Sequence, residues 1–101
     1  MTYVMLYKTK VKPEKIERMK ELSAQFFEIY KEHDIEVLGH WSRIDKPTTN
    51  YLMIQYASEA DYASKVEKLK SDERYQSLSV ELNQIRKDFK MKRLVPTGVM
   101  S

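Results

Sequence analysis

One histidine in a predicted strand is the residue best suited to acid–base chemistry. His40 lies between Gly39 and Trp41, in a stretch rich in β-branched and aromatic residues. Its imidazole changes charge near neutral pH, so it can accept a proton from a substrate or act as a ligand. The alternative is an ordinary strand histidine that hydrogen-bonds a carbonyl or water at the sheet surface. If the chain has a ligand site, we predict that His40 lies in or beside it.

Four other side chains have the chemistry to bind an organic molecule. Trp41 can wall a pocket for an aromatic substrate, and we expect it to be at least partly buried; a core or interface role is the alternative. The hydroxyl groups of Tyr7 and Tyr56 can orient a phenolic or quinone-like ligand, unless they are ordinary buried tyrosines. Arg43 can bind a carboxylate or stay solvated near a turn. The candidate substrate-binding residues are therefore Tyr7, Trp41, Arg43 and Tyr56.

Composition excludes several classes of site. The 101-residue chain has no cysteine, which excludes a disulfide framework, a zinc–thiolate site and a thiol nucleophile. It has only two histidines and two glycines, so it lacks a metal-ligand spacing and a glycine-rich phosphate loop. We predict no metal and no bound cofactor. The absence of cysteine is compatible with the location we expect, a reducing cytoplasm.

The charge pattern indicates neither a nucleic acid partner nor a membrane. The net charge of +3 is too small to indicate nucleic acid binding without a clustered patch. Residues 86–93 form a basic stretch with an interleaved aromatic residue, which we interpret as a solvated face and edge strand. No apolar run approaches the ~20 residues of a membrane span.

Hydrophobic periodicity predicts the elements that position these residues. The predicted strands, rich in β-branched and aromatic residues, span residues 3–11, 35–44, 50–57 and 89–95. The predicted amphipathic helices span residues 12–34, 58–70 and 72–85. Residues 45–50 predict the turn of a hairpin, and Ser58 with Asp61 forms a variant of the capping box.

Alternation within the second predicted strand places its side chains on two faces. Strict period two puts His40 on one face with Leu38, Ser42 and Ile44. The opposite face then carries Val37, Gly39, Trp41 and Arg43. A glycine inside a strand often marks a bulge or a close approach by other atoms.

The order of these elements predicts one α+β domain over residues 1–101. It is the ferredoxin-like βαββαβ pattern, with a four-stranded antiparallel sheet and an extra helix. Right-handed crossovers place the helices on one face of that sheet. The strand at residues 3–11 is nevertheless apolar on both faces at its start, and a large bare apolar face is unfavourable in water. We therefore expect a homodimer in which two sheets pack face to face.

Five short motifs along nearly the whole chain follow the pattern of one family. They are Val11-Lys12-Pro13, Leu38-Gly39-His40-Trp41, Tyr56-Ala57-Ser58, Asp72 with Tyr75, and Leu94-Val95-Pro96. In these motifs the chain resembles the NIPSNAP family, within the dimeric α/β-barrel superfamily. The resemblance implies the fold and dimerisation more firmly than a reaction. Superfamily relatives include small cofactor-independent monooxygenases, haem-degrading enzymes and isomerases.

Two functions of different classes follow from this reading. The first is a homodimer with a small apolar pocket that binds or transforms an aromatic or other organic molecule, as an oxygenase or isomerase without a bound cofactor. The second is a non-enzymatic binding or assembly module. A cofactor-independent monooxygenase and a haem-handling protein are further roles that the resemblance implies. The sequence leaves open whether the protein is an enzyme.

Overall fold

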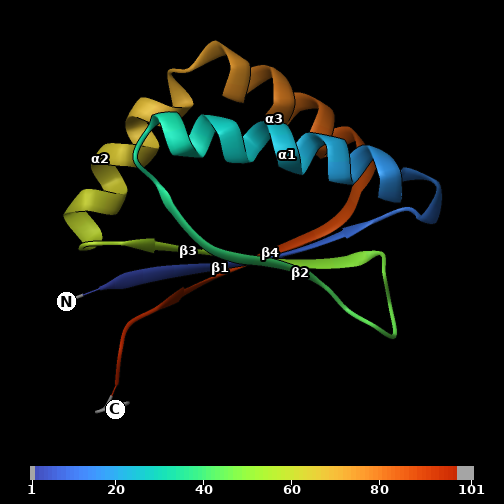
Figure 1. The fold of residues 1–101 in the computed structure, drawn as a ribbon, viewed down its shortest axis with the longest axis horizontal. Coiled ribbons are helices and arrows are strands. Elements are labelled where there is room, and N and C mark those ends of the chain that lie inside the picture. The colour runs from blue at the N-terminus through green and yellow to red at the C-terminus, as the bar shows by residue number, and fades with distance from the viewer. Residues whose placement is uncertain (1, 98–101) are drawn as a thin grey trace.

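The structure, a computed structural model, describes residues 2–97 of the chain. Four strands form one antiparallel sheet with the order β2-β3-β1-β4 (Figure 1). The strands are β1 (Tyr3–Val11), β2 (Glu36–Ser42), β3 (Thr49–Tyr56) and β4 (Arg86–Leu94). The helical elements are the 3-10 turn η1 (Pro13–Lys15) and the helices α1 (Ile16–Glu32), α2 (Glu59–Lys70) and α3 (Glu73–Ile85). The predicted ferredoxin-like α+β fold is confirmed, while residues 1 and 98–101 of the predicted domain lie outside the described part.

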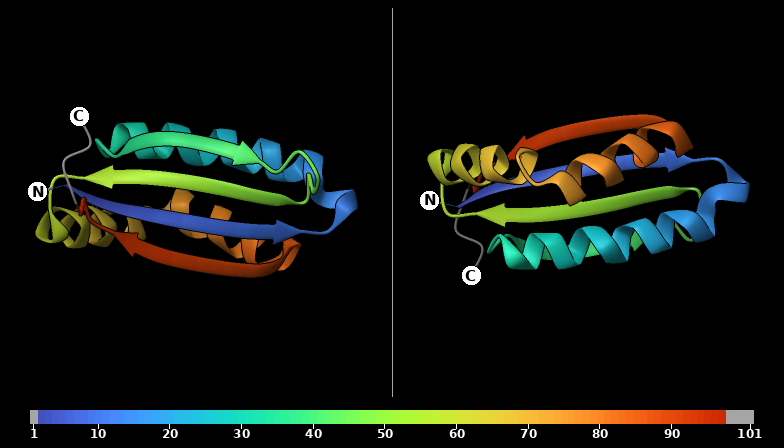
Figure 2. Two further views of the ribbon diagram at one scale, coloured as in Figure 1. Left: turned by 90° about the horizontal axis from the view of Figure 1, so that it is seen from below. Right: turned by 90° about the horizontal axis from the view of Figure 1, so that it is seen from above.

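The sheet has one face under the helices and one face without them (Figures 1 and 2). We call these the covered face and the open face. Along β1 the covered face holds Tyr3, Met5, Tyr7, Thr9 and Val11, and the open face holds Val4, Leu6, Lys8 and Lys10. None of the helices in residues 2–97 combines the length and apolarity needed to cross a bilayer.

The core forms where the apolar stripe of α1 meets the covered face. The stripe buries Met19, Leu22, Phe26, Ile29 and Tyr30, at the spacing that one helix face requires. Met5 of β1 and Ile54 of β3, which are paired across the sheet, are 0% and 1% exposed. The predicted stripe is therefore confirmed, and it packs directly on the central strands.

The helix ends follow local hydrogen-bonding rules. The Ser58 side chain accepts a hydrogen bond from Asp61 N at 3.0 Å, and Asp61 Oδ2 accepts one from Ala57 N at 2.9 Å. This confirms the predicted variant of the capping box. The end of α1 shows no cap in the sequence, but Asp34 adopts a φ of 55°. Ile35 N then donates to Tyr30 O at 2.9 Å, which closes the helix in the way that a glycine usually does.

The last strand begins earlier than the sequence predicts. The sequence predicts this strand over residues 89–95, whereas β4 starts at Arg86, directly after α3 and without a loop. The physical reason is pairing with β1, because Val11 is opposite Arg86 and Lys10 is opposite Asp88. Pairing with β1, which is distant in the sequence, thus makes residues 86–88 part of the strand although they have no strand pattern of their own.

Candidate functional site

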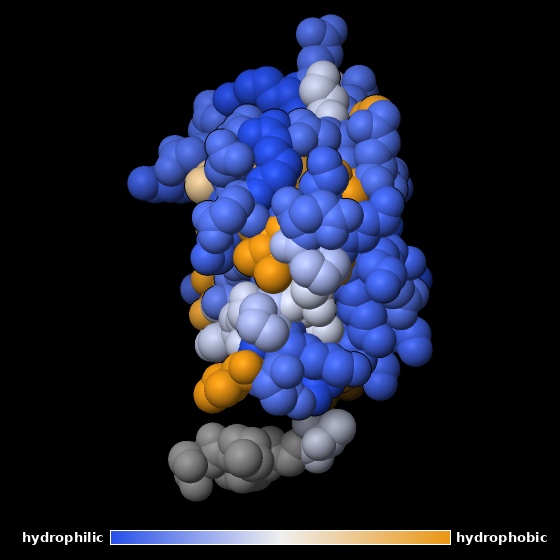
Figure 3. Space-filling view, turned by 90° about the vertical axis from the view of Figure 1, so that its right-hand side faces the viewer, coloured by the Kyte–Doolittle hydropathy of each residue, from blue (hydrophilic) through white to orange (hydrophobic). Residues whose placement is uncertain are grey.

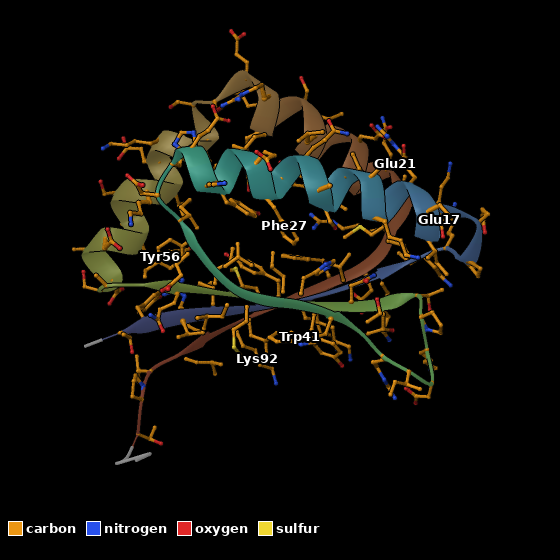
Figure 4. The ribbon with its side chains drawn as sticks, in the orientation of Figure 1. Glu17, Glu21, Phe27, Trp41, Tyr56 and Lys92 are labelled. Atoms are coloured by element: carbon orange, nitrogen blue, oxygen red, sulfur yellow. The ribbon has the colours of Figure 1, made fainter. Side chains whose placement is uncertain are left out.

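A cavity of about 380 Å³ lies between the covered face of the sheet and the helices. All four strands contribute to its floor and all three α-helices to its roof. Figure 4 shows Phe27 pointing from α1 toward the sheet and Tyr56 lying on the same side of the sheet. The volume falls in the range of small-molecule sites, and the lining is largely apolar and aromatic, as such sites usually are.

The strand register sets one row of side chains across the floor. From β2 to β4 the row consists of His40, Leu52, Tyr7 and Met91, each paired with the next. All four line the cavity. His40 and Tyr7 are two strands apart, which puts their Cα atoms on the order of 10 Å from each other. Leu52 lies between them in the row, so a ligand that reaches both side chains has to lie above Leu52, on the side of the helices. The strand register, which the sequence could not supply, brings His40 and Tyr7 into this row.

A second row of the floor is polar. Ser42, Asn50 and Thr9 are paired in that order across β2, β3 and β1. Ser42 Oγ donates a hydrogen bond to Asn50 Oδ1 at 2.9 Å. Asn50 and Thr9 are each 7% exposed, and both line the cavity. This row offers a few fixed polar groups to a ligand within otherwise apolar surroundings.

A bulge in β2 places His40 on the covered face. The register shifts between Val37 and Gly39, so Val37 and His40 face the helices although they are three residues apart. This confirms the bulge that Gly39 indicated in the sequence. The prediction that Leu38 and Ile44 share the face of His40 is wrong. The bulge interrupts the alternation at Leu38, and β2 ends at Ser42, before Ile44. Leu38 is 43% exposed, and Ile44 lies fully exposed in the loop after β2.

His40 sits in apolar surroundings that keep it neutral. Its ring meets Phe27 edge to face, with centroids 5.3 Å apart and an interplanar angle of 83°. Burial lowers the pKa of His40 below its ordinary value, because a desolvated imidazolium is less stable than neutral imidazole. At neutral pH the ring is therefore able to accept a proton.

The tyrosines of the cavity are hydrogen-bond donors rather than bases. Burial raises the pKa of Tyr7 and Tyr56, and neighbouring tyrosines raise it further. Tyr56 packs edge to face on Tyr62 with centroids 5.1 Å apart, and Phe26 packs on Tyr75 at 5.6 Å. These phenols stay protonated at neutral pH, so Tyr7 and Tyr56 can orient a ligand oxygen but cannot act as phenolate nucleophiles.

Trp41 and Arg43, both predicted to bind substrate, lie outside this cavity and do not contribute to its lining. Trp41 is 51% exposed on the open face, where its ring covers Gly39 and leaves no room for a Cβ atom. Figure 4 shows it pointing away from the helices. Arg43 follows β2 in an exposed loop, where Nε donates to Asp45 Oδ1 at 3.0 Å. Figure 3 shows that the surface at this end of the molecule is mainly hydrophilic.

One end of the cavity holds an arginine that the sequence did not single out. Arg86 lines the cavity and donates a hydrogen bond to Asn83 Oδ1. Its Cζ lies 4.2 Å from the centroid of the Phe89 ring, and Phe89 stacks on Tyr7 at 5.9 Å. In the sequence Arg86 is one of several basic residues, and only the direct junction of α3 and β4 sets it apart.

The described residues show no metal centre. Within residues 2–97 no group of three or more histidine, aspartate or glutamate side chains could hold a metal ion. The second histidine, His33, places Nε2 2.9 Å from Asp72 Oδ2, and its side chain is not part of the cavity lining. Arg74 and His33 both lower the pKa of the Asp72 carboxyl, so this cluster joins α1 to the start of α3.

Comparisons with known proteins bear on the fold. No family model matches the sequence, and no curated protein is significantly similar to it. A NIPSNAP family protein from Agrobacterium tumefaciens superposes with a TM-score of 0.86 at 21% identity, over 96% of this chain and 94% of that chain. An uncharacterized NIPSNAP domain protein from Burkholderia xenovorans gives 0.86 at 14% identity, over 98% of each chain. The fold is shared with NIPSNAP proteins.

The likeness extends to an enzyme fold. An antibiotic biosynthesis monooxygenase superposes with a TM-score of 0.77 at 15% identity, over 97% of this chain and the whole of that chain. The resemblance seen in the sequence motifs is therefore confirmed at the level of the fold. A shared fold does not carry an activity with it, so function has to be argued from the cavity itself.

Proposed function

We propose that the protein binds a small, largely apolar aromatic molecule in the cavity, as a homodimer of two sheets packed through their open faces. The observation that carries the proposal is the convergence of Tyr7, His40 and Tyr56 on one aromatic-lined cavity of about 380 Å³. The fold likeness to NIPSNAP proteins and to an antibiotic biosynthesis monooxygenase supports it. A cytoplasmic location remains part of the proposal.

His40 is the residue that we assign to proton transfer. Its neutral imidazole accepts the proton of a phenol-type hydroxyl group, and the resulting phenolate oxygen is stabilised by the hydroxyl group of Tyr7 or Tyr56. Such general base catalysis typically contributes ~10²–10⁴-fold to a rate. Loss of this proton is a suitable first step for either an isomerase or a cofactor-independent oxygenase, and neither needs a metal in the cavity.

The open face supports the homodimer. Its apolar side chains come from all four strands: Val4, Leu6, Trp41, Tyr51, Met53 and Leu94. Trp41 and Leu94 are 51% and 38% exposed in the single chain. A second copy of the same face would remove this apolar surface from water, and area removed from water is the main driving force of association.

Binding is tested with 2-naphthol, a neutral phenol whose two fused rings suit a cavity of this size. We expect a titration followed by ¹H–¹⁵N NMR to shift the amides of the cavity lining, including those of His40 and Tyr7. Ser79→Trp should abolish the shifts, because Ser79 lines the cavity. Ser77→Trp is the matched control on the same helix, since Ser77 is exposed and outside this cavity. Shifts confined to the open face would contradict the proposal.

A binding module without chemistry is the second candidate. The lining favours it in one respect, because within residues 2–97 it contains no aspartate or glutamate to act as a general acid beside His40. Oxygen uptake and product formation with 2-naphthol separate the two candidates. Turnover that His40→Gln abolishes while binding persists supports the enzyme; binding without turnover in the wild-type protein supports the module.

A further inference from the structure

The charges around the cavity are unbalanced. Among residues 2–97 the lining contains two permanent cations, Lys70 and Arg86, and no carboxylate. Neither cation takes part in an ion pair within that part of the chain. A cleft with one sign of charge and low-dielectric walls raises the local concentration of ligands of the opposite sign.

Of the two cations, Arg86 is the one held in a fixed position. Asn83 accepts a hydrogen bond from its guanidinium group, and the Phe89 ring supports the face of that group at 4.2 Å. Lys70 is exposed at the end of α2 and has a flexible stem. A planar guanidinium held in this way presents its remaining N–H groups in a geometry that matches a carboxylate.

The surroundings of Arg86 add an energetic reason. Burial lowers its pKa, although an arginine stays charged at neutral pH. The side chain therefore carries a partly desolvated charge without a protein carboxylate to compensate it. An anionic ligand would supply that compensation, and its hydrogen bonds to the guanidinium would be charge-assisted.

We propose that the ligand of this cavity is an aromatic acid, whose carboxylate binds Arg86 and whose ring packs against Phe89 and Tyr7. This inference rests on the proposed function, because it names the class of ligand for the same cavity. Phe89 and Tyr7 stack at 5.9 Å beside Arg86 and line the cavity with it. The site therefore joins an apolar surface to a single oriented cation.

The test compares two probes of nearly equal shape, 2-naphthoate and 2-naphthamide, by calorimetric titration at neutral pH. We expect wild-type protein to bind the anion roughly tenfold more tightly than the amide, because one charge-assisted contact typically changes an affinity by about this factor. Arg86→Gln should bring the ratio of the two affinities close to one, because the variant loses the charge that distinguishes the carboxylate from the amide. Arg43→Gln is the matched control, because Arg43 lies outside the cavity and is paired with Asp45.

The outcomes separate this inference from the proposed function. Equal affinities in the wild-type protein, or a ratio that Lys70→Gln abolishes and Arg86→Gln preserves, would overturn the role of Arg86 while binding in the cavity stands. If neither probe nor 2-naphthol binds, both proposals fail. Should Arg86→Gln not fold, the salt dependence in wild-type protein decides instead. Added salt should weaken the binding of 2-naphthoate but not that of 2-naphthamide, and an equal response of both would overturn the inference.

Discussion

The two faces of the sheet are built from the same strands but meet different surroundings. On the covered face Met5 and Ile54 are 0% and 1% exposed under the helices. On the open face their neighbours Leu6 and Met53, also paired, remain only partly buried. Alternation with period two therefore makes both faces apolar, and one chain has helices for only one of them. The difference teaches that helices of the same chain bury the covered face, whereas the open face keeps apolar side chains in water, which the proposed homodimer would bury.

The open face also has a charged half, which limits where a partner can pack. Lys8 and Lys90 are directly opposite each other, and Lys92 lies next to Leu6. Figure 4 shows Lys92 on the same side of the sheet as Trp41. Like charges placed opposite each other are unfavourable, so these lysines need solvent. We therefore expect the contact between subunits to centre on the apolar half, around Val4, Leu6 and Met53.

The largest effect is expected from a charge in that apolar half. Leu6→Glu should convert the proposed homodimer into a folded monomer. The new carboxylate would lie opposite Lys92, and both charges would have to leave water on association, which costs several kcal/mol for each ion. Light scattering would then give the chain mass of 12.1 kDa instead of twice that value. The fold should persist, since Leu6 does not contribute to the covered face.

Val80→Glu is the matched control for this experiment. Val80 is 60% exposed on α3, on the helical side of the molecule, so its replacement should leave the dimer intact. Wild-type protein that scatters as a 12.1 kDa monomer at micromolar concentration would refute the sheet-to-sheet dimer. An equal response of both variants would show that the open face is not special.

A methionine pair sharpens the comparison within one subunit. In the monomeric Leu6→Glu background, Met5→Ala should cost about 2–5 kcal/mol of unfolding free energy, because it empties space in a packed core. Met53→Ala, the same change on the open face of the neighbouring strand, should cost clearly less. Urea denaturation measures both values. Similar losses would mean that the two faces are equally packed in the single chain.

The smallest expected effect is a pH dependence from His40. Burial lowers its pKa below the ordinary 6.5, so the unfolded chain binds the proton more readily than the folded protein. Stability should therefore be undiminished above about pH 6.5 and should fall as the pH decreases through this value. His40→Gln should reduce the fall in the urea midpoint between about pH 7.5 and pH 5.5. An unchanged pH dependence would contradict the burial of the imidazole.

The sequence by itself determined the features that depend on near neighbours. The stripe of α1, the cap formed by Ser58 and Asp61, and the bounds of β1 and α3 all follow from periodicity and from hydrogen bonds spanning a few residues. The glycine in β2 correctly signalled a bulge. These features are predictable because the atoms that stabilise them are close together in the chain.

Only the tertiary structure decides which residues line the cavity. The sequence placed His40, Tyr7 and Trp41 on strands but could not say which would meet, because strand register and the exact position of a bulge depend on pairing partners far along the chain. That pairing brings His40 and Tyr7 into one row, leaves Trp41 on the open face, and extends β4 back to Arg86. Arg86 reaches the cavity because it pairs with Val11, which is distant in the sequence and lies at the end of β1.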